Sequence, residues 1–294
     1  MRTLFLLAAL AAAADTSSAD SNGAQPAADA AEDYLAHAPA HAPTRSANHR
    51  NLEWLRSGDD PVIAGIFRKP LGVEIHATPW FATLRGSFND GGGPISVQND
   101  LGVGDENVFM GKVTLRLTRF RFVMEGSDAE FDGNRSLTSD VTFGDTTFGA
   151  GSQVQSNFDL RNLGFRAEFG VFNNELFSVF VGLGLAYYDI SIGMSGTAGT
   201  ESSDGEAYIP ILELLGQVRP GDFTFELGVA GSSIGIDDWS GDYLDTHISA
   251  GYHVIAGFGI EVGYRRTWLD GDLNGVTLND IAIDGFFVGL TWKF

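Results

Sequence analysis

The sequence predicts an all-β fold, a transmembrane antiparallel up-and-down barrel of about ten strands formed by residues 72–294. Three observations support this prediction. Apolar residues alternate with a period of two from Gly72 to the last residue, as in strands whose two faces meet different surroundings. The alternating runs reach about ten residues, which suits tilted membrane-spanning strands of ~9–11 residues. Short turns also alternate with long, polar, acidic connections, which is the layout of membrane barrels.

The N-terminal residues 1–14 predict a secretory signal peptide. Arg2 supplies a positive charge, TLFLLAALAAAA is apolar, and small alanines precede Asp15, which is the expected order of parts. Residues 15–71, rich in Ala, Ser, Asp and Pro, predict a flexible extension with a short helix around residues 48–67. The mature chain is therefore expected to be exported.

The composition excludes several classes of function. The chain has 18 Lys and Arg against 38 Asp and Glu, a net charge of −20, which argues against a nucleic-acid partner. It contains no cysteine. This excludes disulfides, thiolate metal sites, a cysteine nucleophile and a lipid-modified N-terminal cysteine.

The predicted strands begin near residues 72, 107, 120, 155, 176, 205, 222, 243, 257 and 279. The short turns fall at 118–121, 172–175, 219–222 and 255–258, and the long connections at 86–106, 132–154, 193–206, 237–243 and 270–279. Segment 132–154 has its own alternation around a Gly-Asp turn, so it is expected to extend the third and fourth strands as a hairpin. As an extra strand pair it would change the count, which leaves eight or twelve strands open.

The face opposite the large apolar residues is predicted to line a polar lumen. Apart from histidines, it carries six acidic and six basic residues: Glu74, Lys112, Arg116, Arg121, Glu125, Arg166, Glu168, Glu213, Glu226, Glu261, Arg265 and Lys293. Buried charges are tolerable only when they are paired, so these residues are expected to form salt bridges across a closed interior. The excess negative charge is then expected in the loops and the N-terminal segment.

The last residues resemble a known terminal signal. Gly289, Trp292 and Phe294 match the glycine, hydrophobic and terminal aromatic positions of the signal read by the outer-membrane barrel assembly machinery, whereas Phe287 stands where that signal prefers a polar residue. From about residue 72 the chain is also similar to small outer-membrane barrels of the OmpA-like and opacity type. The resemblance implies an outer-membrane barrel in contact with lipid and lipopolysaccharide, assembled by that machinery, with residues 15–71 in the periplasm. It implies no particular activity.

Two weaker patterns concern metals and catalysis. Asp270, Asp272 and Asn274 match the first ligands of an EF-hand loop, but Ile281 replaces the bidentate glutamate. We therefore expect no cofactor, and at most weak Ca²⁺ or Mg²⁺ binding at acidic loops. His247, with Asp237, Asp238, Asp245, Ser232 and Ser233 nearby in the sequence, is the candidate base of a rim active site.

These observations favour a non-enzymatic, monomeric barrel with a mostly closed lumen and a structural or surface-interaction role. A narrow solute channel is the first alternative, and an outer-membrane hydrolase is the second.

Overall fold

The structure is a computed structural model that describes residues 71–294, apart from 235–238, 256 and 274. The predicted signal peptide, and the predicted extension with its helix up to residue 70, lie outside the described residues. No helix in the described part is long and apolar enough to cross a membrane.

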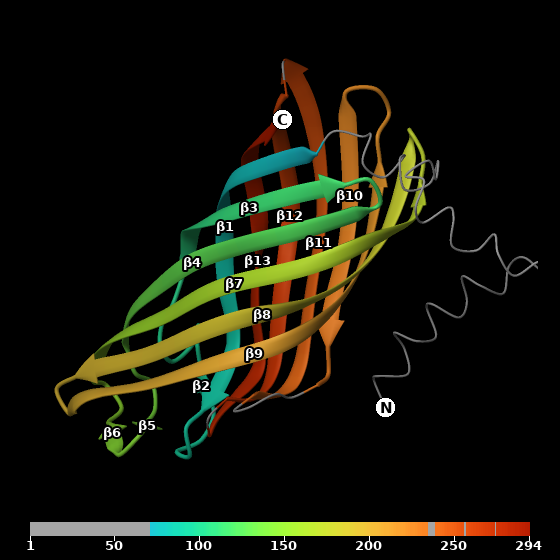
Figure 1. The fold of residues 1–294 in the computed structure, drawn as a ribbon. Coiled ribbons are helices and arrows are strands. Elements are labelled where there is room, and N and C mark those ends of the chain that lie inside the picture. Colours follow the sequence, from blue (N-terminus) through green and yellow to red (C-terminus); the bar gives the residue numbers. More distant parts are fainter. Residues whose placement is uncertain (1–70, 235–238, 256, 274) are drawn as a thin grey trace, which may run out of the picture. The chain divides into compact units, whose positions relative to one another are not determined.

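Ten long antiparallel strands form one closed barrel, because the last strand pairs with the first (Figure 1). They are β1 (Gly72–Asn89), β3 (Asp105–Leu117), β4 (Phe120–Ser136), β7 (Gln153–Asn173), β8 (Phe177–Gly196), β9 (Gly199–Val218), β10 (Phe223–Ser232), β11 (Trp239–Ile255), β12 (Phe258–Leu273) and β13 (Val276–Lys293). Three short strands lie in the connections: β2 (Ile95–Ser96), β5 (Val141–Phe143) and β6 (Thr146–Phe148). The predicted all-β barrel of about ten strands is confirmed.

The two ends of the barrel differ. One end, here called the turn end, holds the short connections between strands, such as those at residues 118–119 and 219–222. At the opposite end, here called the projecting end, β7, β8 and β9 run for 20 or 21 residues whereas β10 has 10. Figure 1 shows β4, β7, β8 and β9 reaching far to one side at this end.

Several predicted long loops are instead strand extensions. β8 and β9 continue until Gly196 pairs with Gly199, so most of the predicted loop 193–206 is ladder. β12 and β13 meet at Leu273 and Val276, which leaves a two-residue turn in place of the predicted loop 270–279. Its sequence is Asn-Gly, and Gly275 has φ 88°, the left-handed conformation that tight hairpin turns require.

The predicted hairpin in segment 132–154 is present but turns inward. β4 and β7 pair as far as Ser136 and Gln153, and β5 and β6 then form a separate two-stranded sheet around Gly144. Phe143 and Phe148 of this hairpin are buried. The hairpin therefore adds no strand to the barrel wall.

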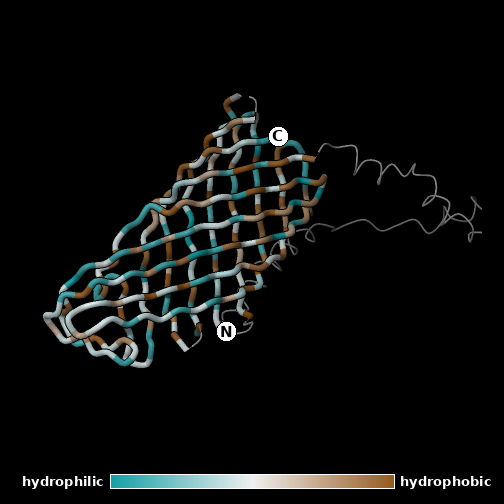
Figure 2. The backbone as a smooth tube through the Cα atoms, turned by 60° about the vertical axis from the view of Figure 1, so that its left-hand side comes forward, coloured by the Kyte–Doolittle hydropathy of each residue, from teal (hydrophilic) through white to brown (hydrophobic). Residues whose placement is uncertain are grey.

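Large apolar side chains form a belt on the outward face. Exposed members include Phe81, Phe165, Leu183, Leu227, Ile248, Phe286 and Leu290, spread over six of the strands. Figure 2 shows hydrophobic and hydrophilic positions alternating along these strands. Such a continuous exposed apolar surface is unfavourable in water and suits lipid hydrocarbon.

The lumen has an apolar layer and a charged layer. The prediction of a wholly polar interior is therefore wrong for the apolar layer. Near the projecting end the inward side chains are apolar, and the connections fold in to pack on them. Fully buried members are Leu84, Phe88, Ile95, Leu101, Phe131, Phe143, Phe148, Phe158, Met194, Ile209 and Trp239. Ile95 and Leu101 belong to the predicted polar loop 86–106, which instead fills the barrel. The charged layer lies toward the turn end.

Candidate functional site

The charged layer of the lumen is the most distinctive polar site of the described residues. All twelve predicted lumen charges are buried or partly buried inside the barrel: Glu74, Lys112, Arg116, Arg121, Glu125, Arg166, Glu168, Glu213, Glu226, Glu261, Arg265 and Lys293. They come from eight of the ten long strands and meet in the lumen because alternate residues of every strand point inward. We call them, with Asp245, His76 and His247, the lumen network.

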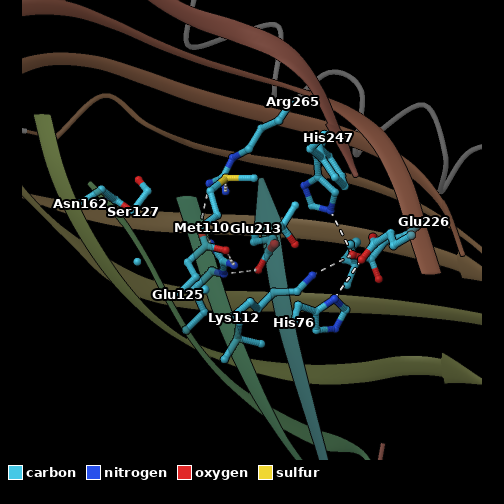
Figure 3. Close-up of a pocket in the computed structure, with 18 of the residues that line it drawn as sticks. His76, Met110, Lys112, Glu125, Ser127, Asn162, Glu213, Glu226, His247 and Arg265 are labelled. Atoms are coloured by element: carbon cyan, nitrogen blue, oxygen red, sulfur yellow. Dashed lines mark hydrogen bonds and ion pairs between the residues drawn. The ribbon is translucent and has the colours of Figure 1, made fainter. Parts of the chain in front are cut away.

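Two arginines, Arg166 of β7 and Arg265 of β12, hold the centre of the network together. Figure 3 shows Arg265 and Glu125 in this part of the lumen. Arg166 of β7 makes two bonds to Glu125, from Nη1 at 3.0 Å and Nη2 at 2.8 Å, and its Nε lies 3.1 Å from Glu213. Arg265 of β12 reaches Glu125 at 2.8 Å and Asp245 at 2.8 Å. Planar guanidinium groups favour such multiple carboxylate contacts. Glu125 therefore links β4, β7 and β12 across the lumen.

A second cluster lies nearer the turn end. Glu74 accepts a bond from Arg116 at 2.6 Å, and Lys293 lies 3.4 Å from it. His76 contacts Glu74 through Nε2 at 3.1 Å and Glu261 through Nδ1 at 2.9 Å. Both ring nitrogens thus face carboxylate oxygens, and both can donate only when the imidazole carries two protons. His76 therefore links Glu74 of β1 to Glu261 of β12 inside the lumen.

The remaining charges complete the wall. Glu226 lies 3.8 Å from the Lys112 ammonium and 3.1 Å from Nε2 of His247. Arg121 pairs with Glu168 at 3.3 Å, and its guanidinium lies 4.7 Å from the centre of the Phe180 ring. Asp245 raises the predicted six acidic residues to seven, against six Lys and Arg. The lumen network is thus close to neutral.

A small cavity lies within the lumen network. Its volume is about 60 Å³, and its walls include Lys112, Glu125, Arg166, Glu226 and Arg265. One water molecule needs roughly 10–15 Å³ by this measure, so the cavity holds only a few. Toward the projecting end the apolar core begins, with Phe287 at the boundary as a member of both.

His247 is not at the rim, which corrects the predicted catalytic constellation. It lies inside the lumen against Glu226. Asp245 is occupied by Arg265 and by Thr267, whose hydroxyl donates at 2.6 Å. Asp237 and Asp238 lie outside the described residues. The inward position of His247 follows from strand parity, since β11 begins at Trp239 and alternates from there.

The predicted metal ligands serve the β12–β13 turn. Asp272 accepts bonds from the Gly275 amide at 3.1 Å and the Thr277 hydroxyl at 3.3 Å. Asp270 accepts one from the Asp280 amide at 3.2 Å. Asn274 lies outside the described residues. Among the residues that are described, no group of three or more His, Asp or Glu is placed to hold a metal ion.

The C-terminal residues close the barrel seam. The Phe294 amide donates to the Val73 carbonyl at 2.8 Å. The Trp292 ring lies 5.0 Å from that of Phe258 and 4.2 Å from that of Phe294. A Cβ at Gly289 would come within 2.5 Å of the Thr78 hydroxyl, so the glycine allows close packing there. The role of Gly289, Trp292 and Phe294 as an assembly signal stays a prediction.

The closed antiparallel barrel, the apolar belt and the paired charges in the lumen together define a membrane-spanning β-barrel. No protein-family model matches this chain, and no curated protein does. Among solved structures it is similar to Ail, the attachment invasion locus protein of Yersinia pestis (13% identity, TM-score 0.35, 76% of this chain and 99% of that one). It is also similar to Neisserial surface protein A (13%, 0.34, 76% and 97%) and to the translocator domain of autotransporter NalP from Neisseria meningitidis (13%, 0.42, 84% and 96%). At TM-scores below 0.5 these likenesses transfer no function to this chain.

Proposed function

We propose that the chain is a non-enzymatic outer-membrane barrel that presents its projecting end outside the cell as an interaction surface. The turn end then faces the periplasm. The observation that carries the proposal is the two-layer filling of the lumen. A pore needs a continuous aqueous path, but here an apolar core and the lumen network lie in series along the axis.

The outer parts of β4, β7, β8 and β9, here called the projecting sheet, support the interaction role because they continue beyond the apolar belt. On its outward face, strand pairing places Asp128 beside Arg161, Arg161 beside Asp189, and Asp189 beside Glu206. The next row pairs Glu130 with Asp159. The seven carboxylates are Asp128, Glu130, Asp132, Asp159, Asp189, Asp204 and Glu206, with Arg161 as the one basic residue among them. We call this surface the acidic face.

Conductance tests the closed lumen. The purified full chain, reconstituted in planar bilayers, should give no steady ion current. A porin reconstituted in the same bilayers serves as the positive control and should conduct. A narrow channel is the second candidate, favoured by the cavity of about 60 Å³ among the lumen charges. A reproducible steady current would favour that channel and contradict the proposal.

Surface labelling tests the orientation. An epitope inserted between Gly144 and Asp145, in the turn of the β5–β6 hairpin, should be detected on intact cells. The same epitope between Pro220 and Gly221, in a turn-end connection, should be detected only after the outer membrane is permeabilised. The opposite pattern would refute the orientation.

A further inference from the structure

One edge of the projecting sheet has no strand partner in the described part of the chain. β9 pairs with β8 over its whole length, from Val218 to Gly199. Its pairing with β10 runs only from Val218 to Leu212. Beyond Leu212, the β10 side of β9 is therefore an open sheet edge, which offers backbone donors and acceptors to another strand.

The register shows which backbone groups point toward this edge. The Arg219 amide, directly after β9, donates to the Leu176 carbonyl on the β8 side. The β8–β9 register has no irregularity, so the odd-numbered amides face β8 and the even-numbered ones face the open edge. Pro210 fits this parity, because a residue without an N–H is tolerated at an edge position. The backbone groups of Thr200, Ser202, Asp204 and Glu206 thus point outward from the sheet edge.

β11 does not extend far enough to cover the outer part of this edge. Leu212 is opposite Gly231, and Gly231 is opposite Leu244. Trp239, the first residue of β11, is five residues outward from Leu244, and Ala207 is five residues outward from Leu212. Trp239 is therefore level with Ala207, and residues 199–206 of β9 extend beyond the start of β11.

The inner side of the same segment is held in place. The Thr146 hydroxyl donates to Glu201 at 2.6 Å, and a Cβ at Gly205 would meet the Leu273 side chain at 2.7 Å. The edge is therefore supported from behind and open at the side, as an added strand requires.

The charges beside the edge select the partner. Asp189 and Glu206 are directly opposite each other on the outward face, although like charges opposed across strands are unfavourable. Asp204 lies one row further out. Side chains of an added strand alternate between the faces, so every second one would lie beside these carboxylates. Lys or Arg at those positions would relieve the repulsion. A second copy of the same edge would add to it.

We propose that the edge of β9 from Gly199 to Glu206 binds an extended segment of a partner polypeptide with Lys or Arg at alternate positions, which adds as a further strand. The proposal rests on the interaction role proposed above. Main-chain hydrogen bonds supply affinity in such strand addition, and the alternate side chains supply specificity.

The test uses the full chain in detergent and a fluorescein-labelled peptide of alternating Lys and Val. Fluorescence anisotropy should show saturable binding that weakens as salt is raised. A peptide with the same residues in two blocks, and one of alternating Glu and Val, should bind at least tenfold more weakly.

Two matched variants separate strand addition from plain charge attraction. Asp204→Ala and Asp204→Pro lose the same charge, but only the proline removes an edge amide. We expect Asp204→Pro to bind the Lys–Val peptide at least fivefold more weakly than Asp204→Ala, with heat-modifiable migration on gels showing that both barrels fold. Glu206→Gln should reduce both the affinity and its salt dependence.

Equal binding by the two Asp204 variants, or equal binding of the alternating and block peptides, would overturn the proposal. Bilayer conductance and the surface epitope are independent of the peptide. They still test the closed, outward-facing barrel if strand addition fails.

Discussion

Replacing Arg166 with methionine should destabilise the barrel far more than the same change at Arg161. Both arginines lie on β7 and both contact carboxylates, but Arg166 is buried in the lumen network whereas Arg161 is exposed and 3.4 Å from Asp128. Without Arg166, Glu125 keeps Arg265, while Glu213 loses its one ion pair among the described residues. Breaking a buried pair from one side costs about 3–5 kcal/mol, and an exposed pair contributes roughly 0–1 kcal/mol.

The free energy of unfolding is measurable by urea titration of the protein in lipid vesicles, followed by tryptophan fluorescence. The double variant Arg166→Met/Glu213→Gln should recover part of the loss, because the unpaired buried carboxylate is also removed. If Arg166→Met costs no more than Arg161→Met, or if the double variant is less stable than the single one, the lumen charges are not mutually compensated as argued.

Three further predictions concern other parts of the chain. Deleting Phe294 should reduce the heat-modifiable protein in the membrane fraction, because the seam bond to Val73 and the predicted assembly signal are both lost; normal accumulation would contradict the signal. Phe143→Ala should cost about 3–5 kcal/mol in the same urea titration, since its buried ring packs edge-on against Phe88 at 5.6 Å; an unchanged midpoint would show that the hairpin does not fill the lumen. Calorimetric titration with Ca²⁺ should show no saturable micromolar binding, with Asp272→Asn as the comparison; saturable binding that the variant abolishes would establish a site at the β12–β13 turn.

The wall of the barrel follows from the sequence because strand parity is a local property. Counting in twos from an apolar neighbour predicts each inward charge, and the structure places residues as far apart in the chain as Glu74 and Lys293 together in the lumen. The same rule places Asp245 and His247 on the inward face of β11. The predicted rim position is wrong because β11 begins at Trp239, four residues before the predicted start near residue 243, so that His247 lies farther inside the barrel.

The alternation of inward and outward residues along the strands does not predict which residues fill the projecting half of the barrel. Ile95 and Leu101 stand among glycines, asparagines and aspartates, so local composition indicates a solvated loop. They become buried because that loop turns into the barrel, where it packs in one apolar cluster with Phe131, Phe143 and Phe158, which are distant in the sequence. Likewise, the sequence pattern makes Asp272 resemble a metal ligand, but in the structure its carboxylate accepts a hydrogen bond from the Gly275 amide of the β12–β13 turn.

The two layers of the lumen and the open edge are connected through strand length. β4, β7, β8 and β9 extend beyond the apolar belt, and an isolated sheet of that length would expose both faces to water. The inward-folded connections cover one face with an apolar core, which leaves the outward face free to be acidic and one edge free to pair. The packing that fills the lumen also supports the inner side of the projecting sheet that a partner would meet. A barrel that lost the core should therefore lose the ordered edge as well, so Phe143→Ala is expected to weaken peptide binding at the β9 edge although residue 143 lies on the inner side of the sheet.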